Sequence, residues 1–108
     1  MKPSPKNIRC DLNCLERQRI LGGPPETVSI CSGLVIITPG ETVGEHSTNN
    51  REEIIVTLEG EGRMIIENSE PLDLRFGTLA YVPPETTHDV VNTGESLLKY
   101  IYVVARTV

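Results

Sequence analysis

The sequence has no long apolar run and no cluster of basic residues. No stretch of its 108 residues is long and apolar enough to cross a bilayer, and the N-terminus lacks the apolar core of a signal peptide. Lysine and arginine total 10 against 15 acidic residues, for a net charge of −5. Nucleic-acid binders usually concentrate basic residues on one face. We therefore expect a cytoplasmic protein that binds neither a membrane nor nucleic acid.

Cysteine is scarce and odd in number. Cys10 and Cys14 are separated by three residues, not by the two that are typical of redox and zinc motifs, and Cys31 stands alone. In a reducing compartment such residues are usually free thiols. We expect them to pack as small apolar side chains and to form no disulfide framework.

Helical periodicity is absent too, whereas β-rich runs separated by glycine, proline and asparagine fill the chain from Val28 onward. These runs read VSICSGLVIITPG, EEIIVTLEGEGRMIIE, LDLRFGTLAYVPP, THDVVNTG and LLKYIYVVARTV. The length fits one domain. We predict a single all-β domain over 1–108, in which 1–27 form an N-terminal arm or edge strand and loop and 28–108 form the barrel core. Within that first part we expect 13–21 to be a loop.

Some of the predicted strands are apolar on both faces. Residues 54–56 read IIV and residues 100–104 read YIYVV. The interior of one barrel covers only one face of each strand, so the outward set needs a second cover. Another copy of a chain this short can supply it, and we predict a homodimer.

The chain has only two histidines, and each lies in a strand-and-turn stretch. A hairpin after His46 would bring Glu53 back beside it, and Thr48 would share a face with His46 because residues two apart on a strand point the same way. His88 follows a second strand and a proline turn. These spacings make the two imidazoles and the carboxylate candidates for one site.

The same stretches resemble the two motifs of the cupin superfamily. The first motif has the form G-x(5)-H-x-H-x(3,4)-E-x(6)-G and the second G-x(5)-P-x-G-x(2)-H-x(3)-N. Two motifs in order on an all-β background are far more specific than one. The resemblance implies a small single-domain cupin of the conserved-barrel type, with a double-stranded β-helix or jelly-roll barrel. The matching residues are Gly40, His46, Glu53 and Gly60, followed by Gly77, Pro83, His88 and Asn92.

The chain departs from the family pattern at two positions. Glu85 replaces a turn glycine, which affects local backbone geometry. Thr48 replaces the second histidine, so the ligand set carried over from metal-binding cupins shrinks to His46, Glu53 and His88. Two imidazoles and a carboxylate still suit a divalent transition metal such as Fe, Mn, Ni or Zn, whereas a neutral hydroxyl is a poor ligand.

The resemblance leaves two functions open. One is a metal-dependent oxygenase, isomerase or lyase acting on a small organic molecule. The other is a cupin that binds or senses a small sugar or carboxylate without metal or turnover. Both remain open because the fold alone does not determine the reaction. We take Thr48, Arg51 and Tyr81 as candidate substrate-binding residues. Arg63 and Arg75 are weaker candidates for contact with an anionic substrate.

Overall fold

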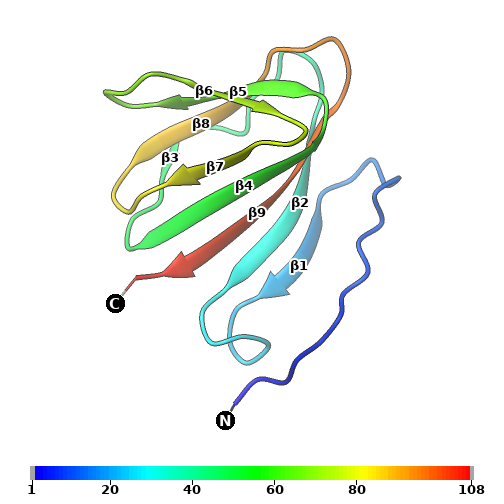
Figure 1. The fold of residues 1–108 in the computed structure, drawn as a ribbon, viewed down its shortest axis with the longest axis vertical. Coiled ribbons are helices and arrows are strands. Elements are labelled where there is room, and N and C mark those ends of the chain that lie inside the picture. The colour runs from blue at the N-terminus through cyan, green and yellow to red at the C-terminus, as the bar shows by residue number, and fades with distance from the viewer. Residues whose placement is uncertain (1, 108) are drawn as a thin grey trace.

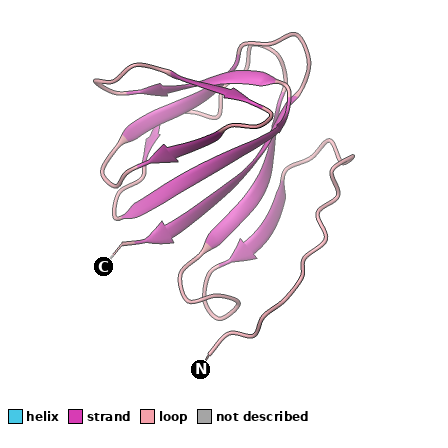
Figure 2. Cartoon of the chain, viewed as in Figure 1, coloured by secondary structure: helices cyan, strands magenta, loops and turns pink. Residues whose placement is uncertain are grey.

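The computed structural model describes residues 2–107, which form nine β-strands and no helix (Figures 1 and 2). The predicted all-β class is confirmed. The strands are β1 (Gln18–Gly22), β2 (Cys31–Ile37), β3 (His46–Ser47), β4 (Arg51–Glu59), β5 (Glu61–Ile66), β6 (Leu72–Arg75), β7 (Leu79–Val82), β8 (Thr87–Asn92) and β9 (Leu98–Arg106).

The strands form two antiparallel sheets that face each other. The five-stranded sheet has the order β1-β2-β9-β4-β7, and the four-stranded sheet has the order β3-β8-β5-β6. Strands adjacent in space are mostly distant in sequence, as β9 lying between β2 and β4 illustrates (Figure 1). Residues from both halves of the chain therefore meet between the sheets.

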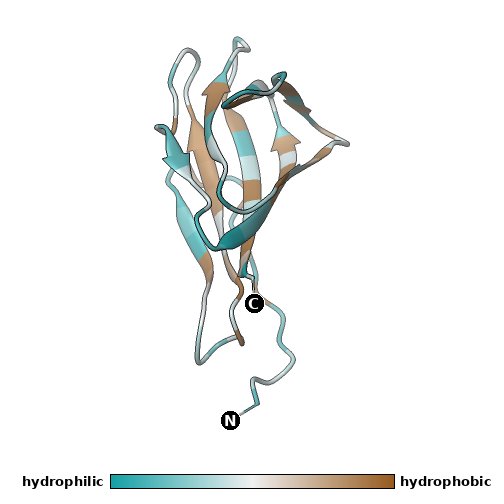
Figure 3. Cartoon of the chain, turned by 90° about the vertical axis from the view of Figure 1, so that its left-hand side faces the viewer, coloured by the Kyte–Doolittle hydropathy of each residue, from teal (hydrophilic) through white to brown (hydrophobic). Residues whose placement is uncertain are grey.

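Side chains alternate between the interior and the outside along each strand, as the period of two requires. In β4, Glu53, Ile55 and Thr57 are buried, and in β8, His88, Val90 and Asn92 are buried. The strands carry most of the hydrophobic residues and the loops are mostly hydrophilic (Figure 3). The core cluster consists of Val35, Ile37, Ile55, Met64, Leu74, Ala80, Val82, Val90, Leu98 and Tyr100.

Two residues of the cupin-like motifs maintain the fold. Gly60 links β4 to β5 at φ 82°, and a Cβ there would lie 2.2 Å from the carbonyl oxygen of Leu97, so only glycine fits. The Asn92 amide nitrogen donates to the carbonyls of Ile37 and Ser96, at 2.9 and 2.8 Å. Asn92 thus joins the end of β8 to β2 and to the loop before β9.

The N-terminal part differs from our prediction in one respect. The segment 13–21 was expected to be a loop, but β1 begins within it and pairs with β2, with Gln18 opposite Leu34. β1 is an edge strand of the five-stranded sheet. Its pairing depends on β2, which sequence patterning within the segment does not reveal.

The outer face of the five-stranded sheet is apolar. Ile54 of β4 lies opposite Tyr81 of β7 and Val103 of β9, and its neighbour on the same face, Val56, lies opposite Leu79. Leu79 and Tyr81 are 61% and 49% exposed. The two-faced apolar patterning seen in the sequence therefore corresponds to an apolar patch on β4, β7 and β9 outside the sandwich.

Candidate metal centre and ligand cavity

A cavity of about 490 Å³ lies between the two sheets. This volume falls in the range of small-molecule binding pockets. The lining residues are Arg17, Val35, Val43, His46, Ser47, Thr48, Asn49, Asn50, Arg51, Glu53, Ile55, His88, Val90, Tyr100, Tyr102 and Val104.

The two histidines come from neighbouring strands of the four-stranded sheet. His46 on β3 lies directly opposite His88 on β8, and their ring centroids are 4.4 Å apart. β3 is only two residues long, but this pairing suffices to fix the position of His46. The rings differ in environment, because His46 is exposed whereas His88 is 2% exposed.

Backbone carbonyls orient both imidazole rings. The Nδ1 atom of His46 lies 2.8 Å from the Gly44 carbonyl oxygen, and that of His88 lies 3.0 Å from the Thr86 carbonyl oxygen. A carbonyl only accepts, so Nδ1 carries the hydrogen in each ring and a neutral ring keeps its lone pair on Nε2. This is the arrangement in which imidazoles bind metal ions in many proteins.

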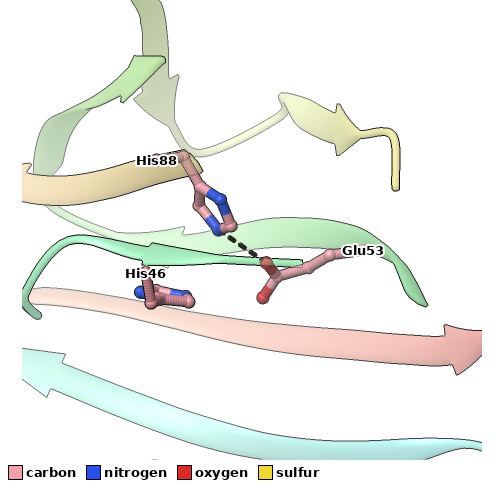
Figure 4. Close-up of side chains that lie close together, drawn as sticks. All are labelled: His46, Glu53 and His88. Atoms are coloured by element: carbon pink, nitrogen blue, oxygen red, sulfur yellow. Dashed lines mark hydrogen bonds and ion pairs between the residues drawn. The ribbon is translucent and has the colours of Figure 1, made fainter. Parts of the chain in front are cut away.

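Glu53 reaches the histidines from the opposite sheet. Its Oε1 lies 2.9 Å from His88 Nε2, and the side chain is nearly buried (Figure 4). Ligand atoms of His46, Glu53 and His88 all lie within 4.8 Å of one another. The predicted convergence of the three groups is thus present, and together they could hold a metal ion.

The pKa of His88 depends on Glu53. Burial alone would lower the pKa of His88 because it disfavours the imidazolium. The hydrogen bonds to Glu53 and Thr86 and the negative charges of Glu53 and Asp89 outweigh burial, so the pKa lies above its ordinary value of 6.5. Without a metal ion a proton joins His88 to Glu53. A metal ion bound to both groups would displace it.

Thr48 supports this arrangement. Its hydroxyl donates to the Pro83 carbonyl at 2.7 Å and accepts from the Thr86 N–H at 3.1 Å. Thr86 in turn supplies the carbonyl that orients His88. Thr48 lines the cavity, but its hydroxyl already donates one hydrogen bond and accepts another within the protein.

The remaining predicted binding residues separate into two groups. Arg51 lines the cavity. Tyr81 does not, because the alternation of β7 points Ala80 and Val82 inward and Tyr81 outward, where its hydroxyl donates to Glu52 at 2.9 Å. That hydrogen bond raises the pKa of Tyr81. Arg63 and Arg75 lie outside the cavity lining and pair with Asp73.

The cavity lining includes residues that were not among the predicted site residues, and three of these bear on its chemistry. Arg17 precedes β1, and Tyr100 and Tyr102 belong to β9. The Tyr100 hydroxyl has its pKa raised, mainly by burial and further by the negative charge of Glu53, so it stays protonated at neutral pH. The alternation of β9 could have placed both tyrosines on one face, but Arg17 carried no such signal.

In residues 2–107, no helix is long and apolar enough to span a membrane.

Comparison with known proteins gives one consistent fold. The family model for the cupin domain matches residues 33–104. A cupin family protein with a double-stranded β-helix fold from Methanocaldococcus jannaschii superposes with a TM-score of 0.78 at 18% identity, covering 94% of this chain and 91% of that one. A predicted oxalate decarboxylase from Thermotoga maritima gives a TM-score of 0.77 at 22% identity, covering 84% and 79%. The expected jelly-roll architecture is confirmed.

A similarity in sequence is more local. The chain is 39% identical over 54 residues to a glucose-6-phosphate isomerase of Pyrococcus abyssi. The match covers 46% of this chain and 29% of the isomerase. It therefore extends over less than a third of that relative.

Proposed function

The chain belongs to the cupin family, and we propose that it holds a divalent transition-metal ion at His46, Glu53 and His88 and binds a small organic molecule beside that ion. The convergence of the three side chains carries this proposal. Two imidazole nitrogens and a carboxylate oxygen suit Fe, Mn, Ni or Zn. Three protein ligands leave coordination positions for water or for a substrate.

The protein itself would supply orientation and protons. The Gly44 and Thr86 carbonyls hold the two rings with Nε2 available. The protonated Tyr100 hydroxyl offers a hydrogen-bond donor on the cavity wall. When bound, the metal ion would act as a Lewis acid toward an oxygen atom of the ligand. Together these groups favour an enzyme of the oxygenase, isomerase or lyase type.

The local similarity to glucose-6-phosphate isomerases supports an isomerase among these three classes. Such chemistry moves a proton next to a carbonyl group, which a Lewis acid and a positioned base promote. The activity of those relatives is a property of proteins that this chain matches over only part of their length. We therefore propose the class and leave the individual sugar or carboxylate to experiment.

Metal analysis tests the proposal directly. Protein purified without added ions, and then reconstituted with Fe, Mn, Ni or Zn, is expected to bind close to one ion per chain. His46→Ala should lose that ion, because one of the three protein ligands is removed. Arg63→Ala, outside the cavity, is the matched control and should bind as wild type does. Absence of metal from the wild type after every reconstitution would refute the proposal.

A second function is favoured by one contact. The 2.9 Å approach of His88 Nε2 to Glu53 Oε1 is complete with a shared proton and needs no metal ion. A cupin that binds or senses a small molecule without metal would use this pair as a hydrogen-bonding or acid/base unit. Ligand binding that persists in metal-free protein, with metal absent after reconstitution, would favour this alternative.

We also propose that the chain forms a homodimer through the outer face of the five-stranded sheet. The apolar surface is formed by four side chains, the exposed Leu79 and Tyr81 and the half-buried Ile54 and Val56. Light scattering at micromolar concentration should give twice the chain mass of 11.9 kDa. Leu79→Glu should shift the mass toward a single chain, and a wild-type mass near one chain would contradict the proposal.

A further inference from the structure

The cavity differs in charge from the protein as a whole. The chain carries a net charge of −5, yet the charged side chains that line the cavity are Arg17, Arg51 and Glu53. Two are positive and one is negative, and Glu53 is already paired with His88. A cavity with low-dielectric walls concentrates the field of such charges. Because Arg17 and Arg51 are exposed, the mouth of the cavity is positive within an acidic protein, before any metal ion is added.

Among residues 2–107, no ion pair neutralises the positive charges of the cavity. Within residues 2–107, the arginines that pair with carboxylates are Arg19, with Glu26 at 2.7 Å, and Arg63 and Arg75, both with Asp73. Arg17 and Arg51 form no such pair in that range. Both guanidinium groups thus remain available for an anion that enters from solvent.

Hydrogen bonds of the preceding loop hold Arg17 at the cavity. Gln18 closes the preceding loop by two hydrogen bonds to the Asp11 backbone, at 2.7 and 3.2 Å. The nearly buried Lys99 of β9 donates to the Leu12 carbonyl at 2.9 Å and fixes the same loop to the sheet. Arg17 is the last residue of this loop before β1. The N-terminal segment thus places the positive charge of Arg17 at the cavity.

The pKa of Tyr100 is consistent with the position of Arg17 at the cavity. Burial and the negative charge of Glu53 raise the pKa of this tyrosine, and the positive charge of Arg17 partly opposes the rise. Tyr100, Glu53 and Arg17 line the same cavity. The guanidinium group therefore acts on the space in which a ligand would lie.

We propose that the cavity binds a small organic anion, bearing a carboxylate or a phosphate ester, and that Arg17 and Arg51 bind its charged group. A guanidinium group matches the oxygen atoms of both anions through paired hydrogen bonds. Two arginines beside a metal centre would repel the ion, and an anionic ligand relieves that repulsion. The inference rests on the proposed function, because it names the ligand class for the same cavity.

Three ligands with one carbon skeleton test the charge requirement. Glucose 6-phosphate and gluconate are anionic, whereas glucose is neutral. Calorimetry on metal-reconstituted protein, in buffer free of phosphate and carboxylate, should show at least one anion binding about tenfold or more tightly than glucose. The preferred anion distinguishes phosphate from carboxylate. Binding should weaken at about 0.5 M salt, because the cavity is partly open to screening ions.

Variants then identify the binding residues. Arg17→Gln and Arg51→Gln should each weaken binding of the preferred anion about tenfold. Arg19→Gln is the matched control, because Arg19 lies two residues from Arg17, is paired with Glu26 and does not line the cavity. Unchanged affinity in Arg17→Gln would overturn the role of Arg17. Equal binding of glucose and both anions, or no anion binding by the wild type up to about 10 mM, would overturn the ligand class.

Metal content of the same preparations separates this inference from the proposed function. Arg17→Gln should retain its ion, because Arg17 belongs to neither the ligand set nor its supporting hydrogen bonds. Anion binding that depends on Arg17 in a protein without metal would sustain the inference and refute the metal proposal. A metal-loaded protein that binds glucose and both anions equally would refute this inference and leave the metal proposal intact.

Discussion

The cavity has a buried wall and an exposed rim, and they are built differently. In the wall, His88 is held by Thr86 and Glu53 and is almost inaccessible to water. At the rim, His46 lies exposed on a two-residue strand. Next to the rim, Glu85 donates its N–H to the carbonyl of the lining residue Asn49 at 2.8 Å and adopts a positive φ of 53°. His88 in the wall is thus held by two hydrogen bonds and by burial, whereas His46 at the rim is held by the β3–β8 pairing and one hydrogen bond and is open to water.

The largest expected contrast comes from replacing each histidine by leucine in metal-free protein. His88→Leu should reduce the free energy of unfolding by about 2–3 kcal/mol, because it leaves the buried Glu53 carboxylate and the Thr86 carbonyl without their partner. His46→Leu should change it little. Urea unfolding after chelation measures both. Equal losses would show that the wall and rim do not differ as described.

Removal of the Thr48 hydroxyl should come next. Thr48→Val keeps the shape but leaves the Pro83 carbonyl and the Thr86 N–H unpaired, for a loss of about 2 kcal/mol. Metal affinity should also fall about tenfold, because Thr86 orients His88. Thr48→Ser keeps the hydroxyl and is the control. A Val variant as stable as the Ser variant would show that these hydrogen bonds contribute little.

A smaller effect of opposite sign is expected next to the rim. Glu85 adopts a left-handed conformation that disfavours side chains with a Cβ, so Glu85→Gly should raise the free energy of unfolding by about 1 kcal/mol. Thermal unfolding measures the gain. Asp89→Gly, at a strand position, is expected to destabilise the protein and serves as the control.

The smallest effect is a pH dependence of the metal-free protein. His88 faces Glu53 from β4, His46 from β3 and the adjacent Asp89, and its pKa lies above 6.5 in the folded state. Its stabilising contribution should be complete below pH 6.5 and be lost as the pH rises through the folded-state pKa. The difference in urea midpoint between wild type and His88→Leu, followed from pH 5 to 9, isolates this contribution. A difference that grows with pH would contradict the assigned shift.

The sequence was sufficient for the centre but not for its surroundings. The convergence of His46, Glu53 and His88 was predicted through the resemblance of two sequence motifs to those of cupins. Tyr81 shows the limit, since inward or outward orientation depends on where β7 begins, and a shift of one residue reverses it. Arg17 could not be found because its position depends on the pairing of β1 with β2 and on the Lys99 contact.

The Thr48 hydroxyl also constrains how this site can change during evolution. A histidine at position 48 would restore the fourth ligand of the usual family pattern, yet it would remove the tie between Pro83 and Thr86 that holds the neighbouring turn. A single substitution would therefore add a metal-ligating nitrogen but weaken the hydrogen bonds that hold Thr86, which orients His88. In a four-ligand centre at this site, another group would have to hold Pro83 and Thr86 in place of the Thr48 hydroxyl.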